Sequence, residues 1–86
     1  MKFEFDPAKS VSNKIKHGLD FVEAQALWAG ETFEIPALAT AEPRTLVIGI
    51  IEGKHWSAVI TERRGKVRII SVRRSRDKEI EIYENR

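Results

Sequence analysis

The stretch TLVIGIIEGKHWSAVITERRGKVRIISVRR, residues 45–74, decides the fold of this chain. It contains three runs rich in β-branched residues, 45–51, 55–61 and 66–73, which are separated by the turn-prone tripeptides EGK and RRG. Strands that are joined by such short loops pair as antiparallel neighbours. The stretch therefore predicts a three-stranded antiparallel meander.

The segment at the start of the chain predicts a short strand and a helix. The opening FEF at residues 3–5 alternates apolar and polar side chains, which is typical of a half-buried strand. Asp6 followed by Pro7 is a helix start signal, and Gly18 is suited to close a helix in the left-handed conformation. We therefore expect a helix over residues 7–17. Its apolar residues fall on one stripe, which consists of Ala8, Val11 and Ile15.

A second helix and a further strand are expected before the meander. Asp20 and Glu23 have the spacing of a capping box, and apolar residues follow at helical intervals as far as Gly30. This pattern predicts a helix over residues 21–29. A short strand over 32–35 and a loop over 37–43 complete the segment.

The end of the chain predicts one more helix and completes the fold class. Ser75 is expected to cap a helix that runs to about Glu84, with Ile80 and Tyr83 as its apolar contacts. A chain of 86 residues is long enough for one compact domain only, so residues 1–86 are expected to form a single domain. The order of elements predicts an α+β fold in two layers, in which an antiparallel sheet packs with the N-terminal helices and the C-terminal helix.

Composition excludes several classes of protein and site. The chain has no cysteine, which excludes disulfides and thiolate zinc sites. Its two histidines, His17 and His55, lack the spacing of a metal-ligand motif, and no phosphate-binding glycine motif or GxSxG is present. We expect no metal and no cofactor. No apolar run approaches the roughly 20 residues that span a bilayer, so we expect a cytoplasmic protein without membrane contact.

The charges are unevenly distributed along the chain, although the net charge is only +2. Residues 62–78 carry eight cations and two acids, a local charge of +6, whereas the remaining chain carries seven cations and eleven acids. Such asymmetry is typical of a surface that binds a polyanion, although a block of like charges can also be a solvated face.

The side chains in and near this basic segment suit cleavage of an RNA phosphodiester without a metal. That reaction needs a base for the 2′-hydroxyl, an acid for the leaving 5′-oxygen and cations for the charge on the phosphorane. Glu62 or His17 is the candidate base or acid, and Arg63, Arg68 and Arg73 are the candidates for charge stabilisation. Alternation along a strand places Arg68 and Arg73 on opposite faces unless a bulge intervenes.

The chain resembles the BrnT toxins from end to end. The resemblance lies in FEFDPAKSVSNKIKHGLDFVEA at the start, in TER after the second long strand, and in VRIISVRRSRDKE followed by a tyrosine. Arg64, where many relatives have a small turn residue, and Val72, in place of the usual alanine, depart from the family pattern. The positions that match polar residues of the family are Lys16, His17, Glu62, Arg63, Arg68, Ser71 and Arg73.

The resemblance implies a RelE-like fold and an endoribonuclease that arrests translation as the toxin of a type II toxin-antitoxin pair. It implies a BrnA-like antitoxin of the ribbon-helix-helix type, a heterotetramer of two toxins with an antitoxin dimer, and operator DNA bound through the antitoxin. We take as catalytic candidates His17, Glu62, Arg63, Arg68 and Arg73. The candidates for binding RNA are Lys16, Arg64, Ser71 and Arg74.

Other interpretations of the same residues stay open. The chain can be a non-catalytic module that binds nucleic acid or a protein partner through the same basic surface, or a toxin fold that has lost its catalysis. An alternative role for His17 is to stabilise the negative end of its helix as a cation, without a part in catalysis. Apolar side chains are numerous for a domain this small, so we expect part of them to be exposed and covered by the antitoxin. This group comprises the stripe of the first helix with Phe21, Trp28, Trp56 and Tyr83.

Overall fold

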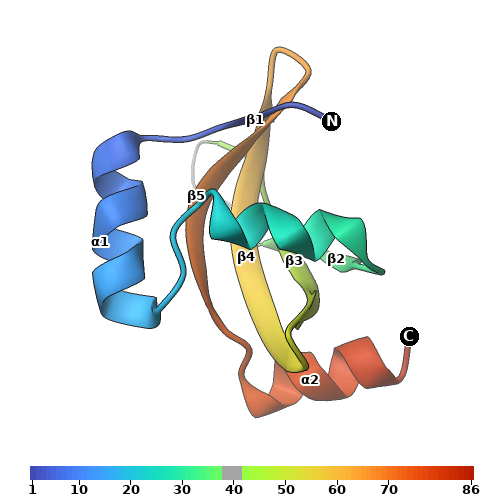
Figure 1. The fold of residues 1–86 in the computed structure, drawn as a ribbon. Coiled ribbons are helices and arrows are strands. Elements are labelled where there is room, and N and C mark those ends of the chain that lie inside the picture. The colour runs from blue at the N-terminus through green and yellow to red at the C-terminus, as the bar shows by residue number, and fades with distance from the viewer. Residues whose placement is uncertain (38–41) are drawn as a thin grey trace.

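The computed structural model of the protein describes residues 1–37 and 42–86 and is shown in Figure 1. The predicted loop over 37–43 therefore lies partly outside the described residues. The elements, in chain order, are β1 (Phe3–Glu4), α1 (Pro7–His17), the 3₁₀ helix η1 (Glu23–Ala29), β2 (Phe33–Ala37), β3 (Arg44–Ile51), β4 (Lys54–Arg63), β5 (Lys66–Arg74) and α2 (Asp77–Glu84).

The five strands form one sheet in the order β1-β5-β4-β3-β2. The predicted meander is confirmed, because β3, β4 and β5 pair antiparallel in sequence order. In both hairpin turns the two central residues have positive φ, Glu52 and Gly53 in one and Arg64 and Gly65 in the other, as type I′ turns require. The expectation of a purely antiparallel sheet is wrong, because β1 pairs parallel with β5.

The register between β4 and β5 shifts in the middle of the two strands. Val59 lies opposite Ser71 and Ile60 lies opposite Ile69, which leaves Ile70 as an extra residue in β5. Directly opposed residues point to the same face of a sheet, so the extra residue reverses the alternation of β5 beyond it. On one face β5 carries Val67, Ile69 and Val72, which are buried, and on the other it carries Arg68, Ser71 and Arg73.

The buried face of the sheet is covered by η1 and the chain before it (Figure 1). Phe21, Ala24 and Leu27 pack there against apolar residues of β3, β4 and β5. A Cβ on Gly49 of β3 would lie 2.7 Å from the Cδ2 atom of Leu27, so this glycine is what allows η1 to approach the sheet so closely.

The second predicted helix is present as a 3₁₀ helix, and its predicted cap is confirmed. The Asp20 carboxylate accepts from the backbone N–H of Glu23 at 2.7 Å, and the Glu23 carboxylate accepts from the N–H of Asp20 at 3.0 Å. The hydrogen bonds expected of Asp6 and Gly18 at the ends of α1 are also present.

The helix α2 packs on the opposite face of the sheet, so the two-layer prediction needs correction. Ser57 alternates along β4 with the core residues Trp56 and Ala58, and its hydroxyl donates to the Glu79 carboxylate of α2 at 2.9 Å. The prediction that Ser75 caps α2 is wrong, because Arg76 precedes the first helical residue and Ser75 shares a hydrogen bond with Ser57. The cap comes instead from Glu79, which accepts from the backbone N–H of Arg76.

The helix α1 is attached to the molecule through polar side chains. Its buried residues are Ser10 and Asn13, whereas Val11 and Ile15 of the predicted apolar stripe are 61% and 83% exposed. The Ser10 hydroxyl accepts from the backbone N–H of Phe21 at 2.9 Å. The Asn13 amide donates to the carbonyls of Leu19 and Val72 and accepts from the N–H of Val72.

Replacement of Asn13 tests this mode of attachment. Asn13→Ala leaves the buried main-chain groups of Val72 and the partly buried carbonyl of Leu19 without this partner, so we expect the free energy of unfolding to fall by about 1–3 kcal/mol. Chemical denaturation measures the change, and Ser12→Ala on the exposed side of the same helix is the control. Equal stability of the two variants would contradict this account of how α1 is held.

Candidate functional site

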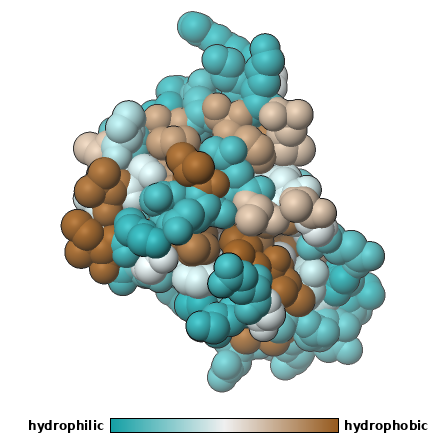
Figure 2. All heavy atoms as spheres, viewed as in Figure 1, coloured by the Kyte–Doolittle hydropathy of each residue, from teal (hydrophilic) through white to brown (hydrophobic). Residues whose placement is uncertain are grey.

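The sheet face that carries Arg68, Ser71 and Arg73 is covered by α2 at one end only (Figure 1). At that end Arg73 and Ser57, which are opposite each other, contact α2. At the other end lies the β4–β5 hairpin, where hydrophilic side chains project from the molecule (Figure 2). The register shift therefore places Arg68 and Arg73 on the same face. Strict alternation predicted opposite faces unless a bulge intervened, and β5 contains such a bulge.

Four residues at the hairpin end form what we call the hairpin-end cluster: Glu4, Arg63, Arg64 and Arg68. Arg68 donates to the Glu4 carboxylate with an Nη1–Oε2 distance of 3.1 Å. Glu4 also lines an open surface hollow of about 410 Å³ together with Arg63 and Arg64. Arg68 thus contacts the half-buried Glu4 carboxylate directly, whereas Arg63, which also pairs with Glu42 at 3.7 Å, and Arg64 border the same hollow.

Sequence reasoning missed Glu4, although a signal for it was present. The residue reaches Arg68 because β1 pairs parallel with β5, and nothing local in the sequence announces that pairing. However, Phe3 and Phe5 both pack against the core, so the residue between them must point to the opposite face of the sheet.

Glu62, a candidate base or acid, points away from Arg68. Glu62 lies opposite the core residue Val67, whereas its neighbour Thr61 lies opposite Arg68. Alternation therefore places Glu62 and Arg68 on different faces of the sheet.

Arg44 is a further residue that the sequence did not single out. By alternation Arg44 points to the same face of the sheet as Leu46. Leu46 lies opposite Val59, which in turn lies opposite Ser71 on the face of Arg68. Arg44 also follows Pro43, whose carbonyl accepts a hydrogen bond from Thr61 at 2.7 Å. Arg44 therefore lies on β3 on the same face of the sheet as Arg68, and its Nε atom is buried without a hydrogen-bond partner.

Arg73 is engaged by an acid of α2. Its two Nη atoms each donate to one oxygen of the Glu79 carboxylate at 2.8 Å. This hydrogen-bonded guanidinium, helped by the Arg76 N–H and the Ser57 hydroxyl, lowers the pKa of Glu79 from its ordinary value of 4.5 to about 2. The charge of Arg73 is thus balanced within the protein, and the pair fastens α2 to the sheet.

The remaining candidates lie toward the α2 end of β5. The helix α1 runs beside β5 away from the hairpin (Figure 1), and its 11 residues span about 16 Å, so Lys16 and His17 lie far from the hairpin-end cluster. Arg74 is on the core side, where its guanidinium carbon lies 5.6 Å from the centre of the Trp56 ring. Ser71 lies between the two ends, on the face of Arg68.

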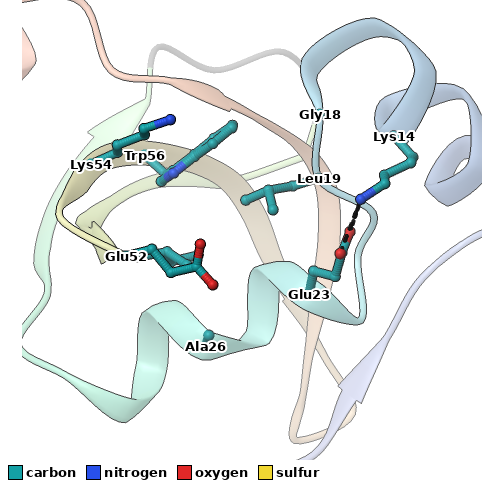
Figure 3. Close-up of a pocket in the computed structure, with 9 residues that line it drawn as sticks. Lys14, Gly18, Leu19, Glu23, Ala26, Glu52, Lys54 and Trp56 are labelled. Carbon is teal, nitrogen blue, oxygen red and sulfur yellow. Dashed lines mark hydrogen bonds and ion pairs between the residues drawn. The ribbon is translucent and has the colours of Figure 1, made fainter.

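A second surface hollow, of about 490 Å³, lies away from this basic face between α1, η1 and the β3–β4 turn (Figure 3). Leu19 and Trp56 line it, and Lys14 pairs there with Glu23 at 2.8 Å. Cations and acids are mixed on its walls, so it does not favour a polyanion. Within residues 1–37 and 42–86, no three side chains suited to metal binding come together, and no helix is long and apolar enough to cross a membrane.

The model of one protein family, described as the ribonuclease toxin BrnT of a type II toxin-antitoxin system, matches residues 5–79. This chain belongs to the BrnT family. No curated protein matches the chain. The BrnT match contains every candidate residue named from the sequence, and Glu4 lies immediately before it. Membership supports a ribonuclease toxin with an antitoxin partner, which agrees with the resemblance stated above.

The Arg73–Glu79 pair predicts a dependence of stability on pH. Because the pKa of Glu79 is lower in the folded chain, the stabilisation is complete above about pH 4.5 and is lost as the pH falls toward about 2. In Glu79→Gln, the decline of the melting temperature over this range should be shallower than in the parent chain. Glu81→Gln, an exposed change on the same helix, is the control. If the melting temperature of Glu79→Gln fell with decreasing pH as steeply as that of the parent chain, the role of the pair would be refuted.

Proposed function

We propose that the chain is a metal-independent endoribonuclease that cleaves RNA at the hairpin-end cluster and thereby arrests translation. The observation that carries the proposal is a carboxylate, Glu4, held 3.1 Å from Arg68 and bordering an open hollow with Arg63 and Arg64. Family membership supports ribonuclease activity in general.

The cluster contains groups that in-line attack by a 2′-hydroxyl requires. In the proposal, the Glu4 carboxylate takes the proton of the 2′-hydroxyl, whose oxygen then attacks the adjacent phosphorus. Arg68, assisted by Arg63 and Arg64, stabilises the charge that grows on the phosphorane, because guanidinium groups donate two hydrogen bonds to phosphate oxygens. The 5′-oxygen leaves and is protonated from solvent, to which the hollow is open.

The proposal assigns different tasks to the other candidates. Glu4 takes the role of base, because Glu62 and His17 lie on other surfaces than Arg68. Ser71 and Arg44 contact RNA next to the cleaved bond, on the same face of the sheet. Arg74 contacts a more distant part of the RNA, whereas Lys16 and His17 lie on α1 outside the RNA surface. Arg73 acts by keeping α2 in place.

We also propose the partner that the resemblance implies. A BrnA-like ribbon-helix-helix antitoxin neutralises the toxin in the cytoplasm, in a heterotetramer of two toxins and an antitoxin dimer that binds operator DNA. The BrnT family description supports an antitoxin in general.

Variants of the cluster test the catalytic proposal. Glu4→Gln removes the base and keeps the shape of the side chain, and Arg68→Ala removes the charge beside it. We expect each change to reduce the rate of cleavage of a defined RNA by about 10²- to 10³-fold, measured with purified protein in EDTA. Lys78→Ala, which removes an exposed cation of the same basic segment, should leave the rate unchanged.

The outcomes separate catalysis from binding alone. If both variants cleave at the parent rate while their melting temperatures stay unchanged, the active site lies elsewhere. If the parent chain binds RNA without cleaving it, the chain is a non-catalytic binding module.

Expression in bacteria tests the cellular role. Induction of the parent chain alone should stop growth and lower the incorporation of labelled amino acids, because translation lacks intact RNA. Induction of Glu4→Gln to the same protein level should allow growth. Arrest of growth by both chains would mean that toxicity does not come from the proposed cleavage.

A further inference from the structure

The outer face of α1 is apolar and uncovered. Val11 and Ile15 are 61% and 83% exposed, and Ala8 is exposed one turn earlier on the same stripe. Figure 2 shows hydrophobic side chains at the edge of the molecule where α1 lies in Figure 1. We call Ala8, Val11 and Ile15 the α1 stripe.

The stripe contributes little to the core of this chain. The inner side of the helix is fixed by the hydrogen bonds of Ser10 and Asn13 to the main chain of Phe21, Leu19 and Val72. An amphipathic helix normally turns its apolar face inward, and here that face is turned outward. An ordered apolar stripe on a helix that is held by other contacts is typical of a surface that a partner covers.

The charges on α1 restrict what that partner can be. The helix carries Lys9, Lys14 and Lys16 and no acid. Lys9 and Lys16 lie on one flank of the stripe at helical spacing, together with Ser12. Two copies of this face would place lysines against lysines, which disfavours a second copy of the chain. An RNA backbone would satisfy the lysines and leave Val11 and Ile15 without apolar contacts.

We propose that the α1 stripe is the docking site for an amphipathic helix of the antitoxin, with apolar residues along its centre and acidic residues facing Lys9 and Lys16. The inference rests on the antitoxin partner of the proposed function, and it does not depend on which residues cleave RNA. Helix pairs of this kind gain specificity from charge and affinity from apolar contact.

A hollow adjoins the end of the stripe. Gly18 and Lys14 of the α1 end line it, and Leu19 and Trp56 supply its apolar walls (Figure 3). A partner helix that lies along α1 and extends past Gly18 would lie next to this hollow. A buried apolar anchor next to a helix contact is a common arrangement in tight complexes.

The double variant Val11→Ser/Ile15→Ser tests the proposal in the full chain. We expect it to bind the cognate antitoxin at least about tenfold more weakly by isothermal titration calorimetry. The free variant should cleave RNA at the parent rate and melt at the parent temperature, because the stripe has few contacts within the chain. Ile50→Ser, which changes an apolar residue of β3 that is 40% exposed, should bind the antitoxin as the parent does.

A charge variant tests the chemistry of the partner separately. Lys9→Glu places an acid where the proposed helix carries acids, so binding should weaken and the loss should shrink at high salt. Unchanged affinity of both variants would overturn the proposal. It would also be overturned if the parent were a dimer and the double variant a monomer by sedimentation, because the stripe would then join two copies.

The experiment also distinguishes failure of the proposed function from failure of this inference. A parent chain that binds antitoxin but cleaves no RNA would refute the ribonuclease proposal and leave the docking site standing. Cleavage that the antitoxin inhibits equally in the parent and the double variant would refute the docking site alone.

Discussion

The extra residue Ile70 in β5 is the constraint on which the rest of the structure depends. Without the register shift, strict alternation would point Ile69 and Val72 to opposite faces of the sheet, so only one of them could join the core. Arg68 and Arg73 would also lie on opposite faces. With it, the strand supplies three apolar residues to the core and keeps both arginines on the other face. One irregular position therefore serves both the hydrophobic core and the basic surface.

Polar contacts attach both terminal helices to β4 and β5, and this leaves surfaces available for function. Asn13 ties α1 to Val72, and Glu79 ties α2 to Arg73 and Ser57. Because α2 is fastened at one end of the sheet, the hairpin end with Glu4 and Arg68 stays open. Because α1 is fastened by its polar side, its apolar side faces outward. The RNA surface and the antitoxin surface can thus be separate.

Local signals in the sequence predicted the elements well, and contacts between distant segments account for what was missed. The two hairpins, the cap at Asp20 and the end of α1 at Gly18 follow from short-range chemistry. The bulge in β5 and the parallel pairing of β1 depend on tertiary packing. Residue spacing alone therefore did not predict that Arg68 and Arg73 share a face, or that Glu4 lies beside Arg68. The basic segment indicated a polyanion surface, but Glu79 takes up the charge of Arg73.

The most direct test of this account is the chemistry of the RNA ends that the protein produces. Purified protein is incubated with a defined RNA in EDTA, and the fragments are identified by mass spectrometry. If Glu4 activates a 2′-hydroxyl beside Arg68, the fragments carry a 2′,3′-cyclic phosphate and a 5′-hydroxyl, and a single 2′-deoxy substitution at the cleaved nucleotide abolishes the cut. Fragments with a 5′-phosphate and a 3′-hydroxyl, or cleavage that survives the 2′-deoxy substitution, would contradict the account.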